Sequence, residues 1–152
     1  YPGSVAADTN TVAIRDNSGD LRVNLLRGTA LTAKYADLAE KYTTAEQYSI
    51  GTAMTICNHS NHESCAADVA DFVIGVISEK PAYLMNEESP GQSVGLKGRL
   101  PLRTEGVVEK GKPLFVSNLG VASQNGTGAM VGIALESSDE TNEKLIEVIL
   151  KN

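Results

Sequence analysis

Two cysteines and two histidines lie within one nine-residue segment, and the chain has no other Cys or His. In order they are Cys57, His59, His62 and Cys65. Two thiolates and two imidazoles can hold a tetrahedral zinc ion, and a site closed by four protein ligands would be structural rather than catalytic. The spacing is not that of a standard zinc finger. A Cys57–Cys65 disulfide across a hairpin loop, or two reduced thiols in a polar loop, also fits these residues. We expect no cofactor apart from the zinc that this loop could hold.

Two carboxylates, Asp37 and Glu40, could do acid–base chemistry if one of them were desolvated. The segment around them, residues 32–42, predicts a short helix, because four apolar residues follow the spacing i, i+3, i+4, i+7. These are Tyr35, Leu38, Ala39 and Tyr42. On such a helix the two carboxylates are one turn apart. A solvated face with an ion pair between Asp37 and Lys41 is the competing interpretation.

Other catalytic motifs are missing from the sequence. Neither Ser78 nor Ser117 has a histidine near it along the chain, so nothing in the sequence supports a serine–histidine pair. The glycines at 126 and 128 do not form a phosphate-binding motif. We therefore expect a protein that is not an enzyme.

The elements that would position these residues are mainly short strands. β-Branched segments separated by glycine and turn residues predict an all-β domain over residues 48–152, barrel-like or clip-like, with mainly antiparallel strands. Residues 1–31 are predicted to form an extended arm, in which two strands flank a turn at Asp16–Asp20. The short helix and a connector follow over residues 32–47. The arm has too few apolar residues to bury a core alone, so we expect it to pair with other copies of itself. Extended segments are predicted at 11–15, 21–26, 49–56, 71–77, 93–96 and 98–104. Residues 145–150 alternate poorly and fit a buried strand or a short helix, and their β-branched residues favour the strand.

The composition is that of a globular, acidic protein. Thirteen Lys and Arg against nineteen Asp and Glu give a net charge of −6, and 41% of the residues are hydrophobic. Such a charge is repelled by nucleic-acid backbones and anionic membranes, and the chain has no Trp for base stacking. No apolar stretch is long enough to span a bilayer. We expect neither a nucleic-acid partner nor membrane insertion.

Four polar loops could present a binding surface, because loops on a rigid scaffold commonly carry recognition. They cover residues 58–64, 87–92, 123–128 and 137–143. The candidate binding residues in them are Asn58, Glu87, Gln124, Asn125 and Asp139.

Several motifs together resemble the structural proteins of tailed bacteriophages. TNTVAIRDNSGDLRVNLLRGTA, at residues 9–30, resembles the strand–turn modules of phage fibre proteins. ADLAEKY with YSIGT, GVISEKPAYLMN, VGLKGRLPLRTEGVVEKGKPLFVS and MVGIALESSDETNEKLIEVIL follow in the order found in a C-terminal module of marine and cyanobacterial phage proteins. Two features depart from that pattern: the cysteine–histidine loop, and Lys112 in place of an aspartate.

The resemblance implies a virion protein, assembled in the host bacterial cytoplasm, that forms the distal module of a tail fibre or spike. It implies roles in trimer assembly and host attachment, with sister copies, other virion proteins and a bacterial surface receptor as partners. A capsid decoration protein is an alternative. A more distant likeness, to self-cleaving chaperone domains of tailspikes, implies that Asp37 and Glu40 could belong to an autoprocessing site.

Overall fold

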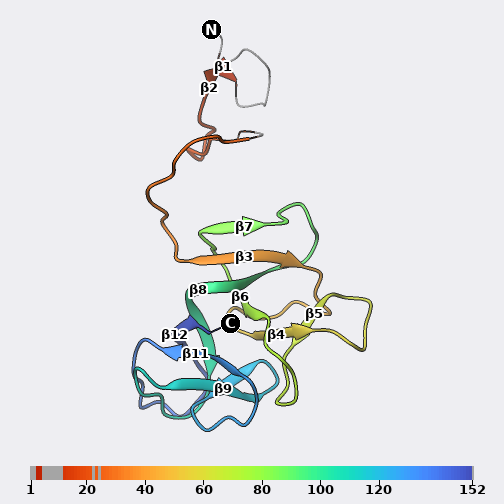
Figure 1. The fold of residues 1–152 in the computed structure, drawn as a ribbon, viewed down its shortest axis with the longest axis vertical. Helices are drawn as coiled ribbons and strands as arrows, with labels where there is room; N and C mark the ends of the chain where they lie inside the picture. The colour runs from red at the N-terminus through yellow and green to blue at the C-terminus, as the bar shows by residue number, and fades with distance from the viewer. Residues whose placement is uncertain (1–2, 5–11, 22, 24, 152) are drawn as a thin grey trace. The chain divides into compact units, whose positions relative to one another are not determined.

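The computed structural model describes residues 3–4, 12–21, 23 and 25–151, and every regular element within them is a β-strand (Figure 1). The chain forms two compact units, Tyr1–Thr32 and Ala33–Asn152. None of the described residues belongs to a helix that could cross a membrane. The all-β expectation is confirmed.

Five strands of the larger unit form a closed barrel. They are β8 (Gln92–Thr104), β9 (Pro113–Asn118), β10 (Val121–Ser123), β11 (Met130–Ala134) and β12 (Lys144–Leu150). The hydrogen-bonded order is β10-β9-β11-β12-β8, and a parallel pairing of Ala122 with Thr104 joins β10 to β8. This last pairing closes the ring, so these strands satisfy one another's backbone groups.

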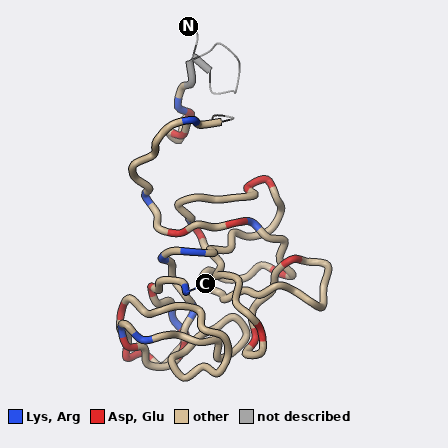
Figure 2. The backbone as a smooth tube through the Cα atoms, in the orientation of Figure 1, with Lys and Arg blue, Asp and Glu red and all other residues tan. Residues whose placement is uncertain are grey.

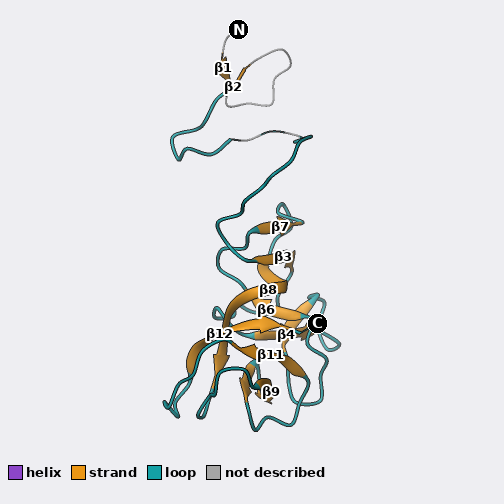
Figure 3. Ribbon diagram, turned by 60° about the vertical axis from the view of Figure 1, so that its left-hand side comes forward, coloured by secondary structure: helices purple, strands orange, loops and turns teal. Residues whose placement is uncertain are grey.

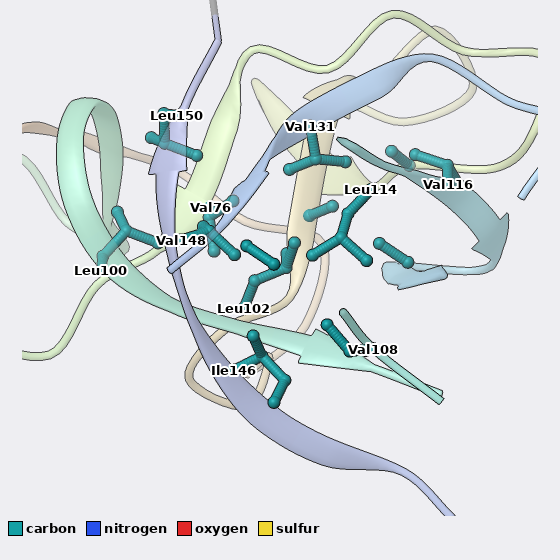
Figure 4. Close-up of a cluster of buried hydrophobic side chains, with 14 residues drawn as sticks. Val76, Leu100, Leu102, Val108, Leu114, Val116, Val131, Ile146, Val148 and Leu150 are labelled. Atoms are coloured by element: carbon teal, nitrogen blue, oxygen red, sulfur yellow. The ribbon is translucent and has the colours of Figure 1, made fainter. Parts of the chain in front are cut away.

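Aliphatic side chains fill the barrel. Along β8, Leu100 and Leu102 are buried while Arg99 is exposed, as the two-residue period of a strand requires. Figure 4 shows side chains from β6, β8, β9, β11 and β12 converging on this core. Those labelled are Val76, Leu100, Leu102, Val108, Leu114, Val116, Val131, Ile146, Val148 and Leu150. Burying each such side chain contributes about 1.5–3 kcal/mol.

A second sheet extends from the barrel through β8 (Figure 3). It adds β3 (Asp37–Tyr42), β4 (Ala53–Ile56), β5 (Ser64–Ala66), β6 (Gly75–Ile77) and β7 (Tyr83–Met85). The order is β5-β4-β6-β8-β3-β7, and only β3 and β7 run parallel. Met54, Ile77 and Val94 form its small core, with Tyr42 and Tyr48 packed against them.

The strand β8 is shared by both sheets. Its first half pairs with β3 and β6, and its second half pairs with β12. The sequence predicted two segments here, 93–96 and 98–104, whereas the structure has one strand of 13 residues. Leu38 pairs with Lys97 and Ala39 with Gly95, so β8 carries an extra residue opposite β3, which bends the strand.

The predicted helix over residues 32–42 is wrong. Residues 37–42 form β3, and residues 32–36 are irregular. In the strand Asp37 and Ala39 face inward and Leu38 is partly exposed, so the apolar residues that would share one face of a helix do not share a face here. Pairing with β8 on one side and β7 on the other outweighs the helical preference of so short a segment.

The smaller unit is held by local contacts. β1 (Gly3–Ser4) pairs in parallel with β2 (Val12–Ala13). The expected turn follows, because the Asp16 carboxylate accepts hydrogen bonds from the backbone N–H groups of Ser18 and Asp20. The second extended segment, 21–26, is not a strand in its described residues. Its positions 22 and 24, and position 11 of the first segment, lie outside the described residues.

Candidate functional site

Asp37 and Ser78 form a buried hydrogen-bonded pair. The Ser78 hydroxyl donates to Asp37 Oδ2 at 2.6 Å, and Asp37 is 5% exposed. Asp37 begins β3 and Ser78 directly follows β6. Both strands flank β8, where Gly95 pairs with Ala39 on one side and Val76 on the other. Gly95 leaves room for the pair, because a Cβ there would lie 3.2 Å from Asp37 Oδ2.

The pair lines a cleft of about 450 Å³. Its walls carry charges of both signs: Lys34, Lys80 and Arg99 are cationic, and Glu79 and Glu147 are anionic. Arg99 and Glu147 form an exposed ion pair of 3.7 Å. The cleft thus combines a serine hydroxyl that is hydrogen-bonded to a buried carboxylate with cationic and anionic side chains elsewhere on its walls.

Glu40 is not part of this cleft. It lies three residues after Asp37 on β3, and an odd separation on a regular strand puts the two side chains on opposite faces. Glu40 accepts a hydrogen bond of 2.9 Å from the Tyr42 hydroxyl. Burial raises the pKa of Tyr42 above its ordinary value of 10.0, and the bond to Glu40 and the charges of Glu40 and Glu63 raise this pKa further.

The interpretation of Asp37 as part of a solvated helical face is therefore wrong. Its carboxylate is buried and accepts a hydrogen bond from Ser78, so it does not lie on a solvated face. Sequence reasoning set Ser78 aside because no histidine is near it. No local signal could have paired it with Asp37, because 41 residues separate them.

The cysteine–histidine segment is the loop between β4 and β5. Cys57 and Cys65 form a disulfide with a Cα–Cα distance of 5.3 Å. The ligand atoms of Cys57, His59 and Cys65 lie within 4.8 Å of one another, whereas His62 is not in this group. The structure thus brings together three of the four residues that the sequence suggested as zinc ligands.

The predicted binding residues lie on separate loops. Asn58, Glu87, Asn125 and Asp139 are exposed. Gln124 is half-buried, and its side-chain amide donates to the Glu109 carbonyl at 2.9 Å. In Figure 2 the loop after β7 is marked by acidic residues, Glu87 and Glu88. These loops do not form one site with the Asp37–Ser78 cleft, since none of the five residues lines it.

The fold is similar to that of bacteriophage phi29 gene product 12. The pre-mature form of that protein superposes with a TM-score of 0.63 at 16% sequence identity, over 88% of this chain and 23% of the other. Its C-terminal fragment gives a TM-score of 0.57 at 16% identity, over 76% of this chain and 100% of the fragment. This chain therefore spans about a quarter of the length of the pre-mature gene product 12.

At this identity the likeness to gene product 12 shows a common fold. No family model matches the sequence, and no curated protein matches it.

Proposed function

We propose that this chain is a virion structural protein of a tailed bacteriophage, the distal module of a tail fibre or spike. The fold similarity to phi29 gene product 12, and above all to its C-terminal fragment, supports this proposal. The sequence motifs that resemble phage fibre proteins, which occur here in the same order as in those proteins, support the proposal independently. The module would assemble as a homotrimer, contact other virion proteins and meet a receptor on the bacterial surface.

The observation that best supports trimer assembly is the exposed apolar surface of residues 14–31. Six large aliphatic side chains there are exposed: Ile14, Leu21, Val23, Leu25, Leu26 and Leu31. Leu31 is 89% exposed. Covering one such side chain is worth about 1.5–3 kcal/mol. Sister copies can cover several at once, because each contributes the same set to a symmetric interface.

The proposal is tested by the mass of the full chain in solution, measured by light scattering. We expect a mass near three times that of one chain. Leu31→Asp should dissociate the assembly, because it puts a charge into the interface. Phe72→Asp is the matched control: Phe72 is 87% exposed but lies in the other unit, so its variant should remain trimeric. A monomeric wild type, or a trimer that survives Leu31→Asp, contradicts the proposed assembly.

Host attachment would use the exposed polar loops, with avidity arising from three linked copies. The acidic loop at Glu87 and Glu88 and the loop at Asn125 are the first places to alter. Substituting these loops should weaken adsorption of particles to cells while leaving the trimer mass unchanged. Unchanged adsorption would show that these two loops do not contribute to receptor binding.

Self-cleavage is a second candidate function, favoured by the Asp37–Ser78 cleft. When the Ser78 oxygen attacks a peptide carbonyl, the Asp37 carboxylate can accept the hydroxyl proton and return it to the leaving amide nitrogen as the C–N bond breaks. Water then hydrolyses the acyl-serine ester and restores the hydroxyl. The similar solved structures include both a pre-mature protein and a C-terminal fragment of it. By analogy, a longer precursor of this chain would be cut once it has folded.

This second candidate is tested by expressing the chain with its natural upstream sequence and following it on denaturing gels. We expect a cut that is lost in Asp37→Asn and in Ser78→Ala. Glu40→Gln is the control, because Glu40 lies on the other face of β3, so its variant should still be cut. An uncut wild type, or a cut that persists in Asp37→Asn, rules out self-cleavage at this cleft.

A further inference from the structure

The loop between β4 and β5 is closed at its base by both its backbone and its disulfide. Thr55 pairs with Cys65 and Ile56 with Ser64, and the Cys57 N–H donates to the Glu63 carbonyl at 3.0 Å. Cys65 is buried and Cys57 is half-buried. Because the ladder fixes the backbone on both sides, opening the disulfide would leave the two thiols near each other.

His59 lies close to both sulfur atoms. Its ring nitrogen and the Sγ atoms of Cys57 and Cys65 are all within 4.8 Å of one another. Asn58 Oδ1 is 3.1 Å from His59 Nδ1. An amide oxygen can only accept, so this contact favours the tautomer with the proton on Nδ1 and the lone pair on Nε2. Such a neighbour is typical of histidines that bind metals.

The surroundings of these three residues favour a cation. A pocket of about 280 Å³ beside them is lined by His59, Cys65, Asp68 and Asp71, together with uncharged residues. Among the described residues that line it there is no Lys or Arg. The carboxylates of Asp68 and Asp71 are therefore not offset by a cationic side chain in this lining, and they favour the approach of a divalent cation.

We propose that reduction of the Cys57–Cys65 disulfide turns this loop into a zinc site whose protein ligands are Cys57, His59 and Cys65. A dithiol reductant supplies two electrons and two protons and is itself oxidised to a disulfide, while the two cysteines become thiols. Zn²⁺ then displaces both thiol protons to solvent and forms two Zn–S bonds and one Zn–N bond, with water in the fourth position.

The geometry requires only a small movement. With Zn–S bonds of about 2.3 Å and a tetrahedral angle, the two sulfurs need to be about 3.8 Å apart. The pair has a Cα–Cα distance of 5.3 Å, and rotation of two side chains supplies that separation. The loop would be closed by a covalent bond under oxidising conditions and by a metal under reducing ones, so the β4–β5 hairpin would keep its shape in both.

Zinc titration of the full chain tests this proposal. The protein is reduced with a phosphine, and Zn²⁺ is titrated in competition with a chromophoric chelator. We expect one zinc per reduced chain and none per oxidised chain. His59→Ala should weaken binding at least about tenfold, since loss of a residue that merely supports a ligand already costs 10–100-fold. His62→Ala, in the same loop but outside the cluster, is the matched control and should bind as the wild type does.

Cobalt(II) provides a readout that does not depend on any variant folding well. Thiolate-to-cobalt charge-transfer absorption should appear in the reduced wild type and be absent from the oxidised protein. The proposal is overturned if the reduced wild type binds zinc no more tightly than Cys57→Ser/Cys65→Ser does. It is equally overturned if His62→Ala weakens binding as much as His59→Ala.

Discussion

The side chains of Asp37 and Ser78 depend on each other because both are buried. Ser78→Ala would remove a donor to a carboxylate that water reaches poorly. We expect the free energy of unfolding to fall by about 1–3 kcal/mol, measured by urea denaturation. Ser117→Ala is the matched control: that hydroxyl donates to Glu105 at 2.7 Å, but both residues are half-buried, so water can replace the bond and the loss should be smaller. Equal losses in the two variants would contradict this account of the Asp37–Ser78 pair.

Tyr42 gives the protein a pH dependence in the alkaline range. Its pKa is raised in the folded state, so the folded protein holds the hydroxyl proton more tightly than the unfolded chain does. The resulting stabilisation is complete below the ordinary tyrosine pKa of 10.0 and is lost as the pH rises through the folded-state value. Denaturation midpoints measured across this range should fall more steeply for the wild type than for Tyr42→Phe.

Glu40→Gln should lower the pKa of Tyr42, as followed by tyrosinate absorbance.

Residue types could be recognised from the sequence, but not their partners. The cysteine–histidine segment was identified as a loop with metal-ligand residues because its members are close along the chain. Asp37 was singled out, but it was paired with Glu40, its neighbour in sequence. Its actual partner, Ser78, comes from another strand, and only the pairing of both strands with β8 brings the two side chains together.

Gly98 lies in β8 with a backbone conformation that residues other than glycine rarely adopt. Its φ is +111°, and a Cβ there would overlap the carbonyl oxygen of Ala36. Gly98→Ala should therefore lower the free energy of unfolding by more than about 2 kcal/mol, because it adds a clash to backbone strain. Gly111→Ala separates the two effects, since Gly111 has a φ of +83° with open space around it. Strain alone should cost about 1 kcal/mol there. Thermal or urea unfolding of both variants measures the difference.

The strand at 145–150 was predicted from its β-branched residues, because its apolar residues alternate poorly. The segment 145–150 corresponds closely to β12, whereas 71–77 shrinks to β6 at Gly75–Ile77. Before β6, the Asp71 carboxylate accepts a hydrogen bond from the backbone N–H of Asp68. This bond stabilises a turn at residues that the sequence predicted to be extended. The prediction of a helix over 32–42 was wrong because a short apolar pattern carries no information about distant segments. Here β7 and β8 pair with residues 37–42 and make them a strand.

The two sheets of the larger unit should unfold together. Leu102 is fully buried in the barrel, and replacing it with alanine should reduce the free energy of unfolding by about 2–5 kcal/mol. Tyrosine fluorescence reports on the second sheet through Tyr42 and Tyr48, and it should shift to lower denaturant together with circular dichroism. Leu145→Ala is the control, because that side chain is 49% exposed and its loss should cost much less. Two separate transitions in Leu102→Ala would contradict a single cooperative unit.

Because β8 forms backbone hydrogen bonds in both sheets, the larger unit has no internal boundary at which it could be divided into two domains. A cut anywhere within β8 would leave each half with an unpaired edge and an uncovered core, so neither half would survive as a soluble fragment. Modular exchange between related proteins, whether by recombination or by design, would therefore have to transfer residues 33–152 as one block and place its junction near Thr32.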